Sequence, residues 1–235
     1  MENDSLYKHS WEVYKAHSEL FDDDFDYYLN FCKGKKTLEL FAGYGRLANY
    51  LSCQGVDIEC VELESNFAKF IDLAQDKVHV CSVLDFKPAS KFDRIVVGYN
   101  SFCLLIRREE ILLFFKKLAS WLVSGGKVAL SYYDHNAWQN TPGHYFNFRG
   151  KKIEYIPGYD LTKRNEKRGV WIDEYKNEEL GIDFKHTYPL RLYEGRDDIL
   201  PFIEMTGLTL IEEIKDYNKK DISDSGWIEY VFEKC

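Results

Sequence analysis

The spacing of hydrophobic residues divides the chain into a regular central part and a different later part. Short apolar runs alternate with amphipathic segments from Thr37 onward. The pattern predicts strands at 37–41, 57–63, 78–82, 92–97 and 127–133 and helices at 46–53, 65–73 and 109–121. The run Phe92–Val97 is hydrophobic almost throughout, as in strands buried on both faces of a parallel sheet. Strands and helices that alternate at this spacing indicate βαβ units and a doubly wound α/β fold.

The pattern changes after residue 134. Three strand-like runs at 151–156, 170–176 and 184–193 have no helical segment between them, which predicts a small antiparallel β insertion. A helix at 197–206 and strands at 209–217 and 227–233 then restore the earlier pattern. We therefore expect a Rossmann-like, mostly parallel seven-stranded sheet whose last strand is antiparallel. The expected domains are a helical cap at 1–34, a cofactor domain at 35–134 and 195–235, and a substrate-binding lid at 135–194.

Composition narrows the range of partners. The net charge is −8, and a nucleic-acid surface normally needs clustered Lys and Arg, so we expect no nucleic-acid partner. No apolar stretch reaches the roughly 18 residues of a membrane span. The six cysteines show no C-x-x-C pair and no His cluster, so we expect no metal site, and a reducing cytoplasm is the simplest compartment.

A glycine-bearing turn is the most informative local feature. The segment 38–46, Leu-Glu-Leu-Phe-Ala-Gly-Tyr-Gly-Arg, joins a predicted strand to a predicted helix. Glycine lets a backbone approach a ligand closely, and the helix start offers unpaired N–H groups. Glu62 follows Gly45 by 17 positions, at the end of the second strand, where its carboxylate can accept both hydroxyls of a ribose. The two features together favour an adenosine-containing ligand.

A nicotinamide dinucleotide is the first alternative. Its G-x-G-x-x-G/A fingerprint is met by Gly43, Gly45 and Ala48, so spacing alone leaves it open. Glu39 argues against it, because a carboxylate just before the turn would lie close to the pyrophosphate and repel it.

Several segments, in sequence order, resemble the motifs of class I S-adenosylmethionine (SAM)-dependent methyltransferases. Glu39–Arg46 resembles motif I, written E/D-x-G-x-G-x-G, and Val61–Leu63 resembles motif II, whose acid holds the ribose. Asn100–Phe102 is similar to the N-S-F segment of the subgroup that contains glycine and amino-sugar N-methyltransferases. The match covers about residues 36–134. The remaining matching segments are Ser82–Phe86, Phe92–Val97 and Leu122–Lys127.

The resemblance implies SAM as cofactor and assigns its contacts. Glu39 and Gly43 would contact the methionine amine and the cofactor backbone, and Gly45 would let the turn pass under the ligand. The motif II residues Glu62 and Leu63 would bind the ribose side of the cofactor. The remaining expected cofactor-binding residues are Ser82 and Val83 at the adenine, Asn100 through its carbonyl at the methionine amine, and Tyr14 and Arg46 at the methionine carboxylate.

Two residues depart from the family pattern. Phe41 stands where the first motif glycine is usual, and Ser82 stands where an Asp commonly binds the adenine amino group. Some family members with a D-L-F-x-G turn also carry Phe at the first position, so we expect binding to survive. The two departures keep open a non-catalytic SAM-binding module that acts as a regulator or partner subunit.

The acceptor is expected to be a small molecule that is methylated on N or O. Methyl transfer mainly needs alignment and a dry site, and a base only for a hydroxyl or a protonated amine. His135 directly follows the fifth strand and is the candidate general base. A protein, peptide or RNA acceptor is the alternative, and a homodimer is expected as a possible assembly. The candidate acceptor-binding residues near strand five and in the insertion are Tyr132, Tyr133, Trp138, Tyr145, Trp171 and Arg191.

Overall fold

The computed structural model describes residues 10–138, 141–218 and 226–235 and separates them into two compact units. The larger unit comprises Asp23–Asp134 and Tyr193–Cys235, and the smaller one comprises Met1–Asp22 and His135–Leu192. Each unit has its own sheet.

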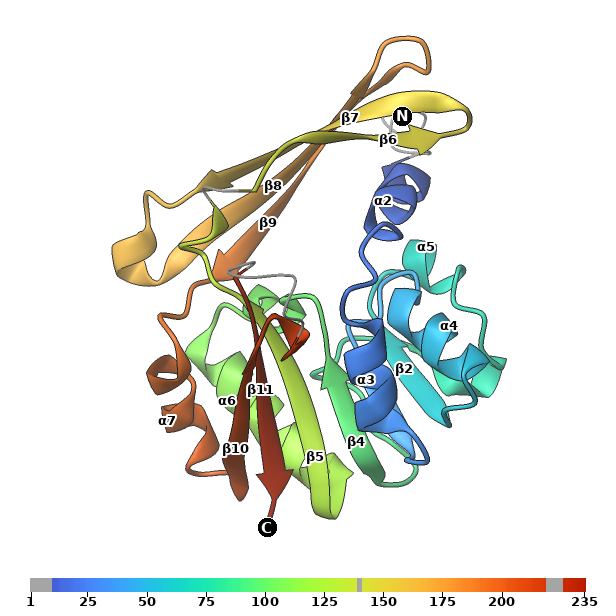
Figure 1. Cartoon of the computed structure of the whole chain (residues 1–235). Coiled ribbons are helices and arrows are strands. Elements are labelled where there is room, and N and C mark those ends of the chain that lie inside the picture. Colours follow the sequence, from blue (N-terminus) through green and yellow to red (C-terminus); the bar gives the residue numbers. More distant parts are fainter. Residues whose placement is uncertain (1–9, 139–140, 219–225) are drawn as a thin grey trace. The chain divides into compact units, whose positions relative to one another are not determined.

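The larger unit is built on a seven-stranded sheet in the order β10-β11-β5-β4-β1-β2-β3 (Figure 1). The strands β1 to β5 run parallel, and β11 is antiparallel to both β5 and β10. This confirms the expected Rossmann-like sheet with its antiparallel last strand. The strands are β1 Thr37–Leu40, β2 Ile58–Glu62, β3 Val78–Val80, β4 Phe92–Val97, β5 Leu122–Tyr133, β10 Leu208–Lys215 and β11 Trp227–Lys234.

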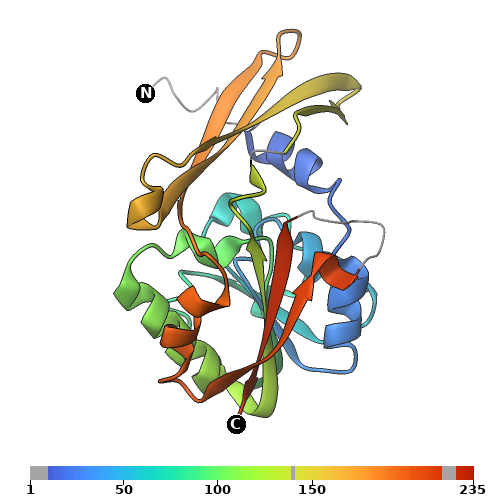
Figure 2. The ribbon, with the colours of Figure 1, turned by 60° about the vertical axis from the view of Figure 1, so that its left-hand side comes forward.

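Helices cover both faces of this sheet. On one face, α3 (Phe25–Cys32) packs beside α4 (Arg46–Cys53), with the rings of Phe25 and Tyr50 stacked 4.1 Å apart. On the other, α6 (Arg108–Trp121) packs beside the short α7 (Leu200–Ile203), as Figures 1 and 2 show. The apolar stripe predicted for α6 is fully buried at Ile111, Phe114, Phe115 and Leu118, and its last predicted member, Leu122, is buried as the first residue of β5.

Two predicted helices of this unit are shorter than expected. The helix predicted at 65–73 is only α5 (Ser65–Ala68). The Asn49 side chain bonds the backbone that follows: its Nδ2 donates to Phe70 O at 3.2 Å, and its Oδ1 accepts from Asp72 N at 2.7 Å. These bonds hold that backbone in a non-helical course. The helix predicted at 197–206 is a 3-10 turn, η5 (Arg196–Asp198), followed by α7, which has Pro201 in its first turn. Proline fits the first turn of a helix but cannot supply a hydrogen-bonding N–H further along. The remaining short 3-10 turns are η1 Gln75–Lys77, η2 Ser101–Leu104, η4 Arg164–Glu166 and η6 Asp216–Asn218.

The smaller unit is a twisted, four-stranded antiparallel sheet carrying one helix, α2 (Ser10–Ser18) (Figure 2). The strands are β6 His144–Phe148, β7 Lys151–Asp160, β8 Arg168–Asn177 and β9 Ile182–Arg191. The sequence prediction missed β6. The feature that could have indicated this strand is the Arg149-Gly150 turn between β6 and β7. Both residues have positive φ, as tight hairpin turns require.

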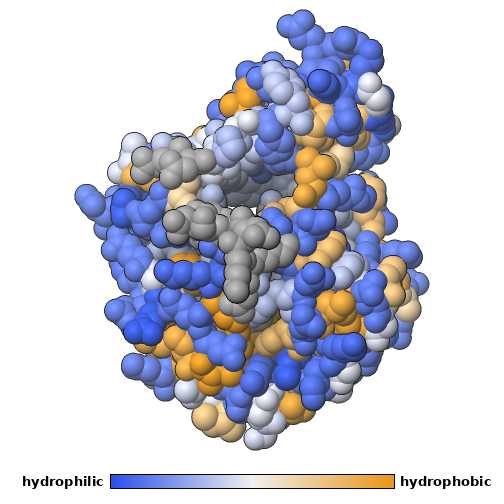
Figure 3. Space-filling model, viewed as in Figure 1, coloured by the Kyte–Doolittle hydropathy of each residue, from blue (hydrophilic) through white to orange (hydrophobic). Residues whose placement is uncertain are grey.

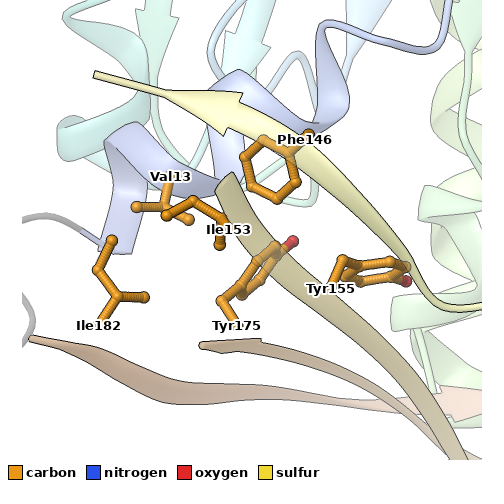
Figure 4. Close-up of a cluster of buried hydrophobic side chains, with 6 residues drawn as sticks. All are labelled: Val13, Phe146, Ile153, Tyr155, Tyr175 and Ile182. Carbon is orange, nitrogen blue, oxygen red and sulfur yellow. The ribbon is translucent and has the colours of Figure 1, made fainter. Parts of the chain in front are cut away.

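The two N-terminal helices belong to different units, although residues 1–34 were expected to form a single cap. In α2, Val13 is fully buried in a cluster with Phe146, Ile153 and Tyr175 of the small sheet (Figure 4). In α3, the Tyr28 hydroxyl donates to Glu229 of β11 at 2.8 Å. The two helices pack against different sheets, α2 on β6 and α3 on β4, and the boundary between the units falls at residues 22 and 23.

Candidate functional site

The glycine turn between β1 and α4 forms the centre of the candidate site. Gly43 and Gly45 have φ of 58° and 81°, and Phe41 has φ of 57°. A side chain at Gly45 would meet Ile71 and Asn49 at 3.0 Å, so this position requires glycine. A Cβ at Gly43 would meet nothing within 4 Å, so the space beside the turn is open. The turn therefore offers close backbone approach to a ligand.

Glu62 ties the end of β2 to this turn. Its Oε2 accepts from Gly43 N at 2.7 Å, and its Oε1 accepts from Glu64 N at 2.8 Å. Burial raises the pKa of Glu62, and the backbone donors Glu64, Gly43 and Leu63 oppose that rise. The structure thus brings together the two sequence features that indicated a ribose. Leu63 itself is exposed.

Glu39 and Arg46 flank the glycine turn, the first within β1 and the second at the start of α4. Burial raises the pKa of Glu39 to about 8, and the nearby Arg46 opposes the rise. The Oε2 atom of Glu39 is buried and has no hydrogen-bond partner. Arg46 forms a bidentate ion pair with Asp24, at 2.7 and 2.5 Å, and Asp24 is fully buried. This site therefore has a buried carboxyl oxygen available to an ammonium group and an arginine fixed by an acid.

The other predicted cofactor residues of this unit follow β3 and β4. Ser82 Oγ accepts from Leu84 N at 3.1 Å, and Val83 is buried beside it. Asn100 has a left-handed backbone with φ of 59°, and its Oδ1 accepts from Tyr133 N at 3.1 Å. Carboxyl ends of parallel strands meet at one edge of a sheet, where ligands of such folds bind. Nine of the ten predicted cofactor-binding residues therefore belong to this unit, at or just beyond the ends of β1 to β4.

Tyr14 is the exception. It lies in α2 of the smaller unit, where its ring stacks on His186 with centroids 6.3 Å apart.

Sequence reasoning named Tyr133 but missed the two other members of an aromatic group at the same edge of the larger sheet. Trp227 begins β11 and pairs with Tyr133, the last residue of β5, with ring centroids 4.8 Å apart. Tyr99, which follows β4, lies 5.4 Å from Trp227, and the Arg46 guanidinium lies 5.7 Å from the Tyr99 ring. Residues 99 and 227 are far apart in sequence, so no local pattern could have joined them. They form an aromatic wall continuous with the glycine turn.

The expected acceptor-binding residues are divided between the units. Tyr132 is buried in the larger unit and donates its hydroxyl hydrogen bond to Tyr193 O, while Tyr133 belongs to the aromatic wall. Tyr145 is 64% exposed on β6, and Arg191 ends β9, both in the smaller unit. The remaining residues form a chain of rings in the smaller unit, with His135 6.3 Å from Trp138 and Trp138 5.3 Å from Trp171.

In the described part of the chain, no group of His, Cys, Asp or Glu is arranged to hold a metal ion. No helix in the same residues is long and apolar enough to cross a membrane. The face of the molecule in Figure 3 is largely hydrophilic, with apolar residues in scattered patches.

Solved structures share this architecture closely. A SAM-dependent methyltransferase from Clostridium acetobutylicum superposes with a TM-score of 0.76 at 17% identity, covering 95% of this chain and 98% of that one. The sugar N-methyltransferase KedS8 from Streptoalloteichus superposes with a TM-score of 0.74 at 15% identity, covering 95% of this chain and 92% of that one. DesVI from Streptomyces venezuelae superposes with a TM-score of 0.73 at 15% identity, covering 100% of this chain and 99% of that one. No protein-family model and no curated sequence matches the chain. The chain therefore has the class I methyltransferase fold, which confirms the resemblance at the level of fold.

Proposed function

We propose that this protein is a SAM-dependent methyltransferase that transfers a methyl group to a nitrogen or oxygen of a small-molecule acceptor. The observation that carries the proposal is the bond between Glu62 and Gly43 N, which joins the ribose-type acid to the glycine turn in a chain of this fold. The solved neighbours include a sugar N-methyltransferase, which supports a small acceptor.

The residues at the turn suit the parts of this cofactor. Glu62 would accept from the ribose hydroxyls, and the open space beside Gly43 would admit the cofactor backbone. The unpartnered Glu39 oxygen would accept from the methionine ammonium. The cofactor supplies an electrophilic methyl group. The chain's part is to bind, to align the acceptor lone pair with that group and to exclude water.

The aromatic wall of Tyr99, Tyr133 and Trp227 is the surface we assign to the acceptor. It lies at the strand ends where ligands of this fold class bind, and it joins Arg46 beside the turn. Apolar ring faces with few polar groups are typical of small-molecule sites. A cytoplasmic location, a homodimer and the absence of a nucleic-acid partner stay predictions from the sequence.

Calorimetric titration with SAM, its demethylated product and NAD tests the proposal. We expect SAM and the product to bind and NAD to give no signal. Glu62→Ala should weaken SAM binding by about tenfold or more, since hydrogen bonds to a charged group contribute about 1.5–3 kcal/mol. Glu62→Gln, which keeps the shape that holds Gly43, should also weaken it. The neighbouring exposed acid provides the control, because Glu64→Gln should bind as the wild type does.

Each alternative predicts a different result. Binding of NAD in place of SAM would overturn the proposal in favour of a dehydrogenase. Tight SAM binding without product formation from any small amine or alcohol would favour the non-catalytic module. Turnover only with peptides or RNA would move the acceptor to a macromolecule.

A further inference from the structure

One face of the small sheet gathers aromatic and histidine side chains around a single acid. Alternate residues of a strand share a face, and the registers align Trp171 with Tyr188, Asp173 with His186, and Tyr155 with Tyr175. We call Tyr155, Trp171, Asp173, His186 and Tyr188 the Asp173 box. Its members come from β7, β8 and β9 and lie entirely within the smaller unit.

Asp173 is buried and bonded only by neutral donors. Its Oδ1 accepts from Tyr155 Oη at 2.8 Å and from Trp171 Nε1 at 2.8 Å. Tyr188 donates a third side-chain hydrogen bond to the carboxylate. Asp173 is 6% exposed, and no Lys or Arg of the described residues forms an ion pair with it. The box thus holds a carboxylate with hydrogen bonds but without a counter-charge.

A buried carboxylate without a cation is costly. Burial raises the pKa of Asp173, while the bonds from Tyr155, Trp171 and Tyr188 lower it. Three donors orient the carboxylate but leave its charge uncompensated, and moving an unpaired charge out of water is unfavourable. A bound cation would remove that cost.

His186 does not provide the missing charge. It lies directly opposite Asp173 in the register, and burial lowers its pKa, so the ring stays neutral near pH 7. Its Nε2 is buried and has no hydrogen-bond partner in the described part of the chain. The box therefore also contains a buried imidazole nitrogen without a hydrogen-bond partner.

The surrounding rings are suited to an organic cation. Trp171 and Tyr188 are half-buried rather than fully packed, and Tyr159, which pairs with Trp171, is 45% exposed. Ring faces attract ammonium groups, most strongly for Trp and Tyr. The apolar cluster of Figure 4 fills the neighbouring part of the same face with α2, through Val13, Phe146 and Ile153. The box is the part of the face where charge and aromatic rings occur together.

We propose that the Asp173 box, within the smaller unit, binds an alkylammonium ligand. The carboxylate supplies the charge and the rings of Trp171 and Tyr188 supply the faces.

The test follows the indole N–H signal of Trp171 in ¹⁵N-labelled full-length protein, because that N–H donates to Asp173. The signal is identified with Trp171→Phe among the five tryptophans. Methylammonium chloride should shift it in a saturable way, whereas sodium chloride at equal ionic strength and methanol at equal concentration should not. Asp173→Asn keeps the side-chain shape and should weaken methylammonium binding by about tenfold or more.

The matched control is Glu174→Gln. Glu174 is the next residue of β8, on the opposite face, and pairs with Lys176 at 2.5 Å, so its removal should leave methylammonium binding unchanged. Equal binding by Asp173→Asn and the wild type would overturn the proposal. So would a wild-type response to methanol as large as that to methylammonium, a result that needs no variant to fold.

Calorimetry with the demethylated cofactor separates this inference from the proposed function. Asp173→Asn should bind that cofactor as the wild type does. A wild-type protein that binds methylammonium but neither SAM nor its product would overturn the methyltransferase and leave the ammonium site standing. A wild-type protein that binds SAM while Trp171 does not respond to methylammonium would do the reverse.

Discussion

Phe41 adopts a left-handed backbone that a non-glycine residue rarely takes. Its φ of 57° lies where the family pattern has glycine, and its ring packs 6.0 Å from Phe114 of α6. Backbone strain of this kind persists only where the surroundings hold it. Phe41 therefore adopts the backbone conformation that glycine has in the motif, and the packing of its ring against Phe114 holds it there.

Ser82 is the second residue that departs from the family motif, and its hydroxyl forms a hydrogen bond within its own turn. It accepts from Leu84 N and so closes the turn that follows β3. A hydroxyl bonded in this way has less capacity for the adenine amino group than a carboxylate would have. The residue-scale geometry explains how the serine is accommodated without assigning it the family role.

Glu229 leads to a pH prediction. It is buried in β11, accepts from Tyr28, and is faced by Ser131 and Asp24, and burial raises its pKa from 4.5 to about 8. The unfolded chain loses this proton near pH 4.5 while the folded chain keeps it, so the free energy of unfolding falls as pH rises between these values. Each pKa unit corresponds to about 1.4 kcal/mol. Glu229→Gln should remove this loss, so its stability relative to the wild type should increase from about pH 5 to about pH 8.

Urea denaturation at several pH values measures the effect. Glu39 has a similarly raised pKa, so part of the pH dependence should remain in the variant. A difference between variant and wild type that does not change with pH would contradict the prediction.

At the scale of elements, the docking of α2 depends on an uncharged histidine. His17 Nδ1 lies 2.9 Å from Tyr175 Oη, and its Nε2 lies 3.1 Å from His144 Nε2. Burial, and then His144, lowers the pKa of His17 from 6.5 to about 3. Two protonated imidazoles could not share the contact, because both would be donors with like charge.

This predicts that α2 loosens in mild acid. Below about pH 6.5, His17 takes up a proton in the unfolded chain but stays neutral in the folded one. The free energy of unfolding therefore falls as the pH decreases toward 3. Hydrogen exchange of Ser10–Ser18, corrected for intrinsic rates, should show decreasing protection from about pH 7 to about pH 5. His17→Gln should reduce this dependence, whereas His79→Gln in the larger unit should not. Constant protection of α2 over this range would refute the prediction.

At the scale of the molecule, two units with separate cores predict separate unfolding. Ile153 is fully buried in the small core with Val13 and Tyr175. Ile153→Ala should lower the stability of the smaller unit by about 2–5 kcal/mol through lost transfer energy and a cavity. Amide exchange of β7 and β8 should accelerate, while that of β4 in the larger unit stays unchanged. Equal acceleration in both units would show a single cooperative structure.

Most strands and the main helix of the larger unit could be predicted from the sequence, because their signals lie within short stretches of the chain. Hydrophobic periodicity located β1 to β5 and the buried stripe of α6, because both signals repeat within a few residues. The boundaries of α5 and α7 were less accurate, since Asn49 ends the first from another helix and Pro201 restricts the second. Strand β6 was missed, although the Arg149-Gly150 hairpin turn that follows it is a local signal.

The candidate site shows the same division. Chain order and spacing were enough to indicate the glycine turn and Glu62, because a strand, a turn and a helix fix their own relative position. Only the tertiary structure could reveal the Asp24–Arg46 pair, the wall of Trp227 and Tyr133, and the carboxylate of Asp173 among its rings. These contacts join residues from separate strands and helices, and long-range packing is not encoded in any local pattern.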